Sequence, residues 1–169
     1  MTHEEIEQLM DDYSLYLLKL AYVYVKNRQS AEDIVQEVFL QLYEQKNYKE
    51  QGKIKSYLSI LVVNRSKNYL SSWSYRMMHL KETYIERSIN EKDELITNEE
   101  RKLIGEAIFK LPLKYREVLF FHYYEDLKTA QMAEIMNVPE STVKTRLVKA
   151  RKLLKDKLPQ NDWEVLSHE

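Results

Sequence analysis

Residues 130–154 read AQMAEIMNVPESTVKTRLVKARKLL, a pattern typical of two short helices separated by a sharp turn. The first helix is predicted from Ala130 to Met136, and Asn137 suits the left-handed conformation that often ends a helix. Pro139 fits the first turn of the next helix, because the N–H that proline lacks is unpaired there anyway. The sequence therefore predicts a helix-turn-helix.

The second helix of this motif has two faces of opposite character. Apolar residues at the spacing i, i+4, i+7, i+11 predict a buried face of Val143, Leu147, Ala150 and Leu154. The opposite face combines lysines, small hydroxyls and one aliphatic side chain. Lysine can donate to guanine, hydroxyls to phosphates or bases, and valine can contact a thymine methyl, so this face suits a DNA major groove. The face comprises Ser141, Thr145, Val148, Lys149 and Lys152, with Thr142 and Lys144 at its flanks.

The composition favours helices along the whole chain. Its 169 residues include only 2 Gly and 3 Pro, which disfavours sandwiches, barrels and nucleotide-binding α/β folds, because their tight turns draw on both residues. The absence of Cys excludes disulfides, Cys-ligated zinc and a thiol nucleophile. The sequence has no apolar run near the ~20 residues of a membrane span, and its acidic start does not resemble a signal peptide. We therefore expect a cytoplasmic protein.

Three helices are predicted in residues 1–75. The first ends near Asn27, and the third runs from about Ile54 to Trp73. Ser30 is the predicted N-cap of the second, because Asp33 follows it three residues later, close to a capping box. Helical spacing predicts that the second helix buries Ala31, Ile34, Val35, Val38, Phe39, Leu42 and Tyr43. It predicts that the third buries Ile54, Tyr57, Leu58, Leu61 and Val62.

A polar segment, residues 76–98, divides the chain. Its charge is dense and its apolar residues keep only a loose period, so we interpret it as a linker. Helical periodicity returns after it, with a break at Leu111 and Pro112. We therefore expect an all-α protein with two small helical domains, 1–75 and 99–160, of which the second contains the helix-turn-helix.

Basic residues are concentrated in two blocks. The net charge is −1, yet residues 46–76 carry 7 Lys or Arg against one acidic residue, and residues 144–157 also carry 7 against one. The first block also contains several tyrosines and a tryptophan, and a strand of unpaired bases is bound by such cations and aromatic rings together. Two contacts with a polyanion are predicted, the alternative being two solvated helix faces.

Three segments of the second domain resemble the promoter −35-reading domain of bacterial RNA polymerase sigma factors, most closely in the extracytoplasmic-function (ECF) subgroup. They are LPLKYREVL at 111–119, AEIMNVP at 133–139 and TVKTRLVKAR at 142–151. The sequence departs from the family where Lys128 stands in place of a frequent Ser at the cap of the first helix, and Thr129 is expected to cap it instead.

The first domain resembles the other domain of the same family. AEDIVQEVF at 31–39 is similar to the helix that binds core polymerase, and SYLSILVVNRSKNYL at 56–70 is similar to the helix that reads the −10 element. The motifs occur in the family's order and cover roughly residues 9–75 and 100–158. The resemblance implies a protein that brings RNA polymerase to promoters and helps to open them.

The resemblance also implies site residues. Core polymerase, through a coiled coil of its largest subunits, would bind Asp33, Gln36 and Glu37, although capping and a solvated face also explain these residues. The melted −10 strand would bind Tyr48, Asn64, Arg65, Lys67 and Asn68. The −35 element would bind Ser141, Thr142, Lys144, Thr145, Arg146, Val148, Lys149 and Lys152. An anti-sigma factor, often at the membrane in this family, is the expected regulatory partner.

Enzyme activity is not expected. The four histidines are scattered without metal-ligand spacing, and no Gly-rich phosphate loop is present. We therefore expect no metal, no cofactor and no small-molecule substrate. The alternative function is a stand-alone helix-turn-helix regulator with an N-terminal dimerisation domain. The aromatic and basic segment 46–76 argues against that alternative, because dimerisation does not need it.

Overall fold

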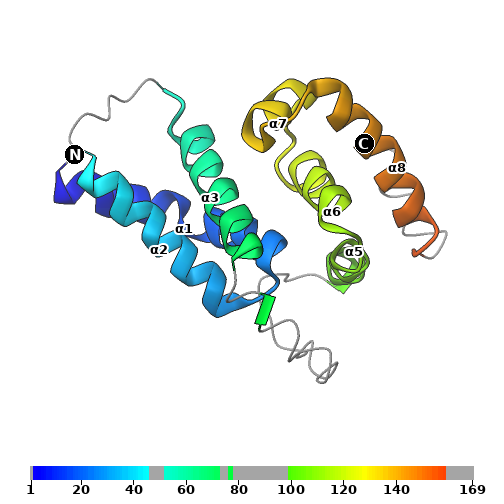
Figure 1. Cartoon of the computed structure of the whole chain (residues 1–169), viewed down its shortest axis with the longest axis horizontal. Coiled ribbons are helices and arrows are strands. Elements are labelled where there is room, and N and C mark those ends of the chain that lie inside the picture. Colours follow the sequence, from blue (N-terminus) through cyan, green and yellow to red (C-terminus); the bar gives the residue numbers. More distant parts are fainter. Residues whose placement is uncertain (1, 46–51, 73–75, 78–98, 159–169) are drawn as a thin grey trace. The chain divides into compact units, whose positions relative to one another are not determined.

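The computed structural model describes residues 2–45, 52–72, 76–77 and 99–158, with the backbone alone for 99–103 (Figure 1). The chain divides into two compact units, Met1–Glu86 and Arg87–Glu169. The described residues form helices without strands, so the predicted all-α class is confirmed. The exact domain boundaries stay a prediction, because most of the expected linker lies outside the described residues. The first unit contains α1 (His3–Val25), α2 (Arg28–Glu44) and α3 (Ile54–Ser71). The second contains α5 (Glu99–Phe109), α6 (Leu113–Leu119), the π-helical turn η1 (Phe120–Tyr124), α7 (Thr129–Met136) and α8 (Glu140–Lys155).

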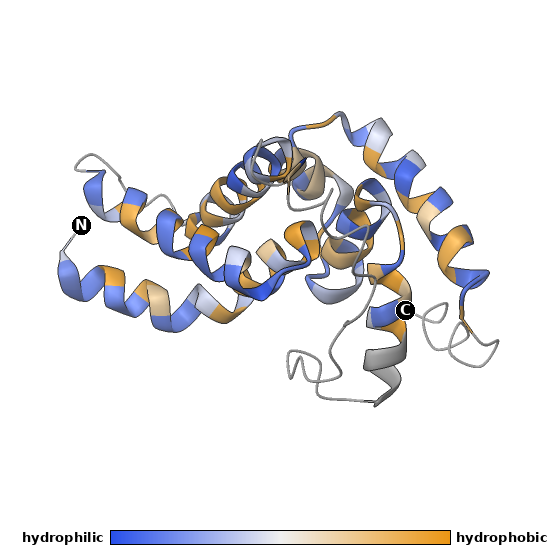
Figure 2. Cartoon of the chain, turned by 60° about the horizontal axis from the view of Figure 1, so that its bottom comes forward, coloured by the Kyte–Doolittle hydropathy of each residue, from blue (hydrophilic) through white to orange (hydrophobic). Residues whose placement is uncertain are grey.

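The core of the first unit lies among its three helices. Helix α1 packs against both α2 and α3, and α2 packs against α3. Hydrophobic and hydrophilic residues alternate along the helices (Figure 2), and in α1 and α2 they separate onto two faces, as in amphipathic helices. The predicted end of the first helix is confirmed within two residues, since α1 stops at Val25 and Lys26 takes a left-handed conformation (φ 54°).

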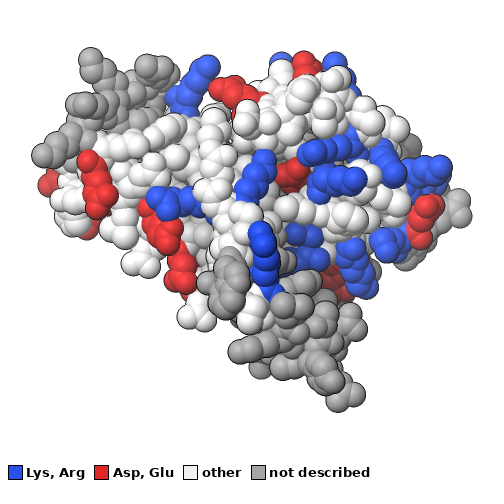
Figure 3. Space-filling model, viewed as in Figure 1, with Lys and Arg blue, Asp and Glu red and all other residues white. Residues whose placement is uncertain are grey.

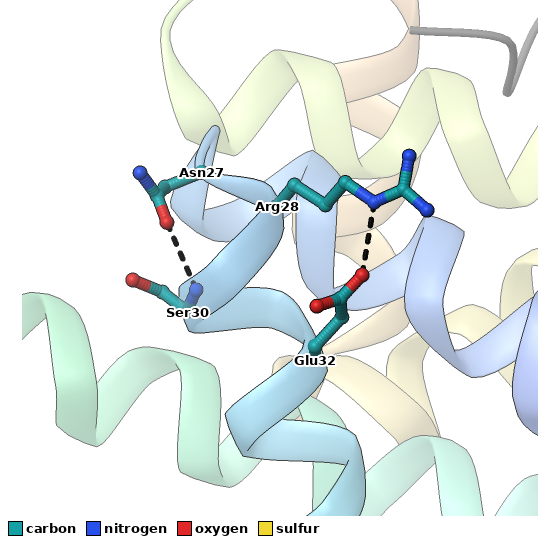
Figure 4. A network of polar contacts seen from close by, with 4 residues as sticks. All are labelled: Asn27, Arg28, Ser30 and Glu32. Atoms are coloured by element: carbon teal, nitrogen blue, oxygen red, sulfur yellow. Dashed lines mark hydrogen bonds and ion pairs between the residues drawn. The ribbon is translucent and has the colours of Figure 1, made fainter.

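The start of α2 differs from the prediction. Asn27 is the N-cap, and its Oδ1 accepts a hydrogen bond from the Ser30 amide at 2.9 Å (Figure 4). Ser30 therefore lies inside the helix, where its hydroxyl bonds to the Tyr69 hydroxyl of α3 at 2.9 Å. Arg28 and Glu32 form an ion pair along the same first turn, at 2.9 Å. The predicted Ser30 cap is wrong, because Asn27 supplies the same chemistry three residues earlier.

The buried faces of α2 and α3 match the prediction in part. Six of the seven residues predicted on α2 are buried, but Tyr43 is 51% exposed. On α3, Leu58 and Val62 are buried as predicted, whereas Ile54, Tyr57 and Leu61 are only half-buried. The face of α3 that points to the core also includes Ser59, Val63 and Ser66.

Buried Ser59 is compatible with the core because its hydroxyl is satisfied. It donates to the Lys55 carbonyl at 2.7 Å and hydrogen-bonds with the Tyr16 hydroxyl at 2.8 Å. A buried polar group with partners costs little free energy. The buried face of α3 therefore includes serines, which the spacing of apolar residues in the sequence does not identify.

The second unit contains the predicted helix-turn-helix. Helix α8 packs against α6 and α7, and all four residues predicted on its inner face are buried. Asn137 has φ 53° and ψ 51°, which confirms the left-handed end of α7, and the next amide, of Val138, bonds to the Ala133 carbonyl at 3.1 Å. Helix α7 begins one residue early, with Lys128 as its N-cap. The expected Thr129 cap is wrong, because the Thr129 hydroxyl donates to Glu140 instead, at 2.6 Å.

Candidate nucleic-acid interface

The outer face of α8 presents the side chains predicted to read DNA. Ser141, Thr145, Lys149 and Lys152 are all exposed, and Val148 has the largest exposed fraction of the large hydrophobic residues described, 69%. Lys144 is exposed at the flank and Thr142 is half-buried. Figure 3 shows Lys and Arg side chains gathered over the unit that contains α8. The predicted orientation of this helix is therefore confirmed, whereas the DNA contacts themselves remain a prediction.

Local interactions fix part of this face. The Thr145 hydroxyl donates to the Ser141 carbonyl at 2.9 Å, and the Lys149 ammonium lies 5.9 Å from the centre of the Tyr115 ring. Lys144 pairs with Glu140 at 3.3 Å. Hydrogen bonds from Thr129 and from Lys144 hold the pKa of the Glu140 carboxyl below its usual value. The Glu140 carboxylate in the first turn of α8 therefore holds the Lys144 ammonium beside it.

Two arginines of α8 turn away from this face. Arg146 Nη1 donates to Glu117 Oε1 of α6 at 2.9 Å, and Glu117 is only 4% exposed. Arg151 Nη2 lies 2.8 Å from His122 Nε2. Burial and the Arg151 charge lower the pKa of His122, and the charge of Asp126 opposes them. The geometry does not support Arg146 as a base contact, because its guanidinium is directed at a buried carboxylate.

The outward side of α3 carries the second group of predicted contacts. Asn64 and Asn68 are exposed, as expected, and Lys67 is half-buried. The guanidinium of Arg65 is directed to α2 instead, where Nη1 donates to Glu37 and Nη2 donates to Gln41 at 2.8 Å. Tyr48 lies outside the described residues.

The three residues predicted to bind polymerase are exposed on α2, but they have different neighbours. Glu37 is paired with Arg65, whereas Gln36 lines a groove of about 560 Å³ between α1 and α2. The groove is mostly apolar, and Met10, Leu40 and Tyr43 on its walls are 42%, 54% and 51% exposed. The sequence prediction missed this surface, although Leu40, a large apolar residue off the buried stripe of α2, is a signal for it.

Both units match family models for bacterial sigma factors. Residues 9–76 match Sigma-70 region 2, and residues 101–154 match Sigma-70 region 4. The RNA polymerase sigma factor SigV of Bacillus subtilis (strain 168) is 30% identical over an alignment of 165 positions, which covers 89% of this chain and 89% of SigV. The chain belongs to the ECF subgroup of the sigma-70 family.

Other relatives support the same assignment. The ECF RNA polymerase sigma factor SigW of Bacillus subtilis (strain 168) is 28% identical and covers 89% of this chain and 87% of its own length. The ECF sigma-E factor of Escherichia coli (strain K12) is 26% identical over 75% of this chain and 72% of its own length. The sigma factor RpoE of Bartonella quintana, solved in complex with the anti-sigma factor NepR, shares the fold with a TM-score of 0.60 and 17% identity, covering 90% of this chain and 96% of RpoE.

This ECF sigma factor directs RNA polymerase to promoters and is not an enzyme. The alternative of a stand-alone regulator is wrong, because the first unit matches sigma region 2 and not a dimerisation domain. None of the helices in the described part of the chain is long and apolar enough to span a bilayer.

Proposed function

We propose that this sigma factor uses three surfaces: α2 with the α1–α2 groove for polymerase core, the outward side of α3 for the melted −10 strand, and the outer face of α8 for the −35 element. The observation that carries the proposal is the exposure of Val148 among cations on α8. An aliphatic side chain that stays in water buries no apolar surface, whereas in a major groove it can contact a thymine methyl.

The −35 surface comprises the outward-facing lysines, hydroxyls and Val148 of α8. Lysines at this face can donate to guanine O6 and N7, and hydroxyls near the helix start can reach phosphates or bases. Arg146 supports this surface from behind through Glu117, since it anchors α8 to α6. The proposed −35 contacts are Ser141, Thr142, Lys144, Thr145, Val148, Lys149 and Lys152.

The −10 surface uses amides and cations of α3. An exposed Asn amide both donates and accepts, so Asn64 and Asn68 can bind the edges of unpaired bases. Lys67 supplies charge beside them, and Tyr48, which the family resemblance assigns to the −10 strand, supplies a ring on which a base can stack. Bases that have left the duplex need such a receiving surface.

The polymerase surface combines a polar row with an apolar groove. Asp33, Gln36 and Glu37 set the orientation of the partner, because charged groups at an interface contribute more to specificity than to affinity. Leu40 and Tyr43 supply the apolar area, since exposed large apolar residues around a groove are typical of a binding surface. Gln36 belongs to both parts, which makes them one continuous interface.

An anti-sigma factor is the proposed regulatory partner. The complex of RpoE with NepR supports it, because RpoE shares the fold of this chain over nearly its full length. A partner that covers the α2 and α8 surfaces would block polymerase and promoter together. We propose the cytoplasm as the location, where polymerase and promoters are found.

A titration of binding to core polymerase tests the proposed polymerase surface. The double variant Asp33→Ala/Gln36→Ala is expected to bind core polymerase more weakly, with unchanged helical circular dichroism, because both side chains are exposed. Leu40→Ser is expected to do the same through the groove. The matched control is Leu15→Ser, an exposed leucine (59%) that does not line the groove. Equal core affinity for all four proteins contradicts the proposed polymerase surface.

The −10 surface has its own test, which is the formation of the open complex on promoter templates. Asn64→Ala is expected to slow open-complex formation on a duplex promoter, detected by permanganate, while the salt dependence of DNA binding is unchanged. A template that is pre-melted at −10 separates two roles: recovery there means that the amide helps melting, and an equal defect means that it binds the separated strand. Full activity on both templates contradicts the −10 assignment.

A further inference from the structure

We propose that Arg65 is a positioning residue of the polymerase surface and not a −10 contact. The proposal rests on the proposed function of α2, which it extends by one residue of α3. Arg65 was expected to follow Asn64 in contacting the −10 strand, because it lies in the α3 segment similar to the −10 helix. Its contacts in the folded chain are instead with side chains of α2.

The guanidinium of Arg65 bridges two side chains of α2. Its Nη1 donates to Glu37 Oε2, and its Nη2 donates to Gln41 Oε1 at 2.8 Å. Glu37 and Gln41 are four residues apart and therefore stand in one row on α2. A planar fork with fixed donors holds both acceptors in one geometry, which a lysine ammonium cannot do.

The third nitrogen of the fork is also unavailable to DNA. Arg65 Nε is buried, and it makes no hydrogen bond within the described part of the chain. The side chain is 33% exposed, whereas its partner Glu37 is 58% exposed. The exposed member of the pair is thus the carboxylate, which can contact a partner while Arg65 holds it from behind.

The direction of the side chain agrees with these contacts. The two hydrogen bonds direct the guanidinium of Arg65 to α2, while Asn64, the preceding residue, points about 100° away from Arg65 around the helix. The Glu37 carboxylate already accepts from Nη1 of Arg65, so a phosphate would have to displace it to bind there. Arg65 therefore fixes where Glu37 lies on the surface that we assign to polymerase.

Two titrations of the full chain test the proposal. The first measures the affinity for core polymerase of Arg65→Ala, Arg65→Lys, Glu37→Ala and the double variant Arg65→Ala/Glu37→Ala. We expect both Arg65 variants to lose about 10-fold in affinity for core polymerase, since lysine keeps the charge but not the fork. We expect the double variant to lose no more than Glu37→Ala alone.

The second titration measures binding to a single-stranded −10 oligonucleotide across salt concentrations, with Lys67→Ala as the control. We expect the slope of log affinity against log salt concentration to be unchanged for Arg65→Ala and less steep by about 0.7 for Lys67→Ala.

The outcomes separate this proposal from the proposed function. If this slope is less steep by about 0.7 for Arg65→Ala and Arg65→Lys restores it, Arg65 contacts a phosphate and the proposal is overturned. Losses in core affinity that add in the double variant overturn it too, because additivity means independent roles. If Glu37→Ala weakens core binding and Arg65→Ala does not, only the Arg65 proposal fails. If Glu37→Ala has no effect, the α2 polymerase surface fails and the Arg65 proposal falls with it. An unchanged slope for Lys67→Ala contradicts the −10 surface alone, while the core titration still decides the role of Arg65.

Discussion

Arg146 of α8 and Glu117 of α6 form an ion pair in which Nη1 lies 2.9 Å from Oε1. The Glu117 side chain is 5% exposed and that of Arg146 is 26% exposed. The pair joins the helix that carries the proposed −35 contacts to the helix behind it. The pair therefore helps to hold in place the helix that carries the proposed DNA-reading face.

Loss of this pair is expected to destabilise the second unit. Removing one partner of a buried pair costs ~3–5 kcal/mol, and because Arg146 is partly exposed we expect about 2–3 kcal/mol for Arg146→Met. Urea unfolding followed by circular dichroism measures the change. The matched control, Lys144→Ala, breaks the exposed pair with Glu140 and is expected to leave the unfolding midpoint unchanged. A midpoint for Arg146→Met equal to that of the control contradicts the structural role of the pair.

His122 is expected to make stability depend on pH. Its Nε2 faces Arg151 Nη2, and because a guanidinium only donates, the neutral ring must accept there. The pKa of His122 is lowered below 6.5 in the folded chain, so between that lowered pKa and 6.5 the unfolded chain binds more protons. Its contribution to stability is therefore complete above pH 6.5 and lost as the pH falls through the lowered value.

The comparison that isolates this effect is wild type against His122→Gln. Thermal unfolding from pH 8 to pH 5 should give a constant difference in stability at high pH and a shrinking difference on acidification, as the wild type loses its advantage. Parallel profiles over the whole range show that His122 does not couple protonation to folding.

Asn137 is expected to tolerate glycine better than alanine. Its φ of 53° lies in the left-handed region, where a β-carbon costs ~1–2 kcal/mol unless the residue is Asn, Asp or Gly. Asn137→Ala should lower the free energy of unfolding by about 1 kcal/mol, while Asn137→Gly should be at least as stable as wild type. The side chain is exposed, so neither change removes buried contacts. Equal destabilisation by both substitutions contradicts a conformational cause.

Periodicity predicted α8 well because its two faces differ sharply. One face of the helix carries Val143, Leu147 and Leu154, and the charged residues lie on the other faces. Only one rotation of the helix therefore buries the apolar face. Helix α3 has apolar residues around most of its circumference, so the pattern alone does not fix its rotation. Its rotation is set by contacts across the fold, among them the hydrogen bond between Ser59 and Tyr16, which are 43 residues apart in the sequence.

The candidate sites show the same limit. The segment that contains Arg65 resembles the −10 helix, but the resemblance gives no direction to one side chain. That direction depends on Glu37 and Gln41, which are contributed by another helix. The wrong cap of α2 has a local reason, because Asn27 is as good a capping residue as Ser30 and only the backbone geometry chooses between them.

The −35 assignment is tested most directly by run-off transcription with core polymerase on a promoter library randomised at −35, comparing Lys149→Ala with Lys155→Ala. Lys149 lies at the centre of the exposed face of α8, and Lys155 is the last residue of the helix. A base contact contributes about 1–3 kcal/mol of discrimination, whereas a phosphate contact carries no sequence information. We predict that Lys149→Ala relaxes the preference at one or two −35 positions, and that Lys155→Ala lowers transcription from all promoters alike. Equal effects of the two substitutions on every −35 sequence contradict the account, because the outer face of α8 would then not read the promoter.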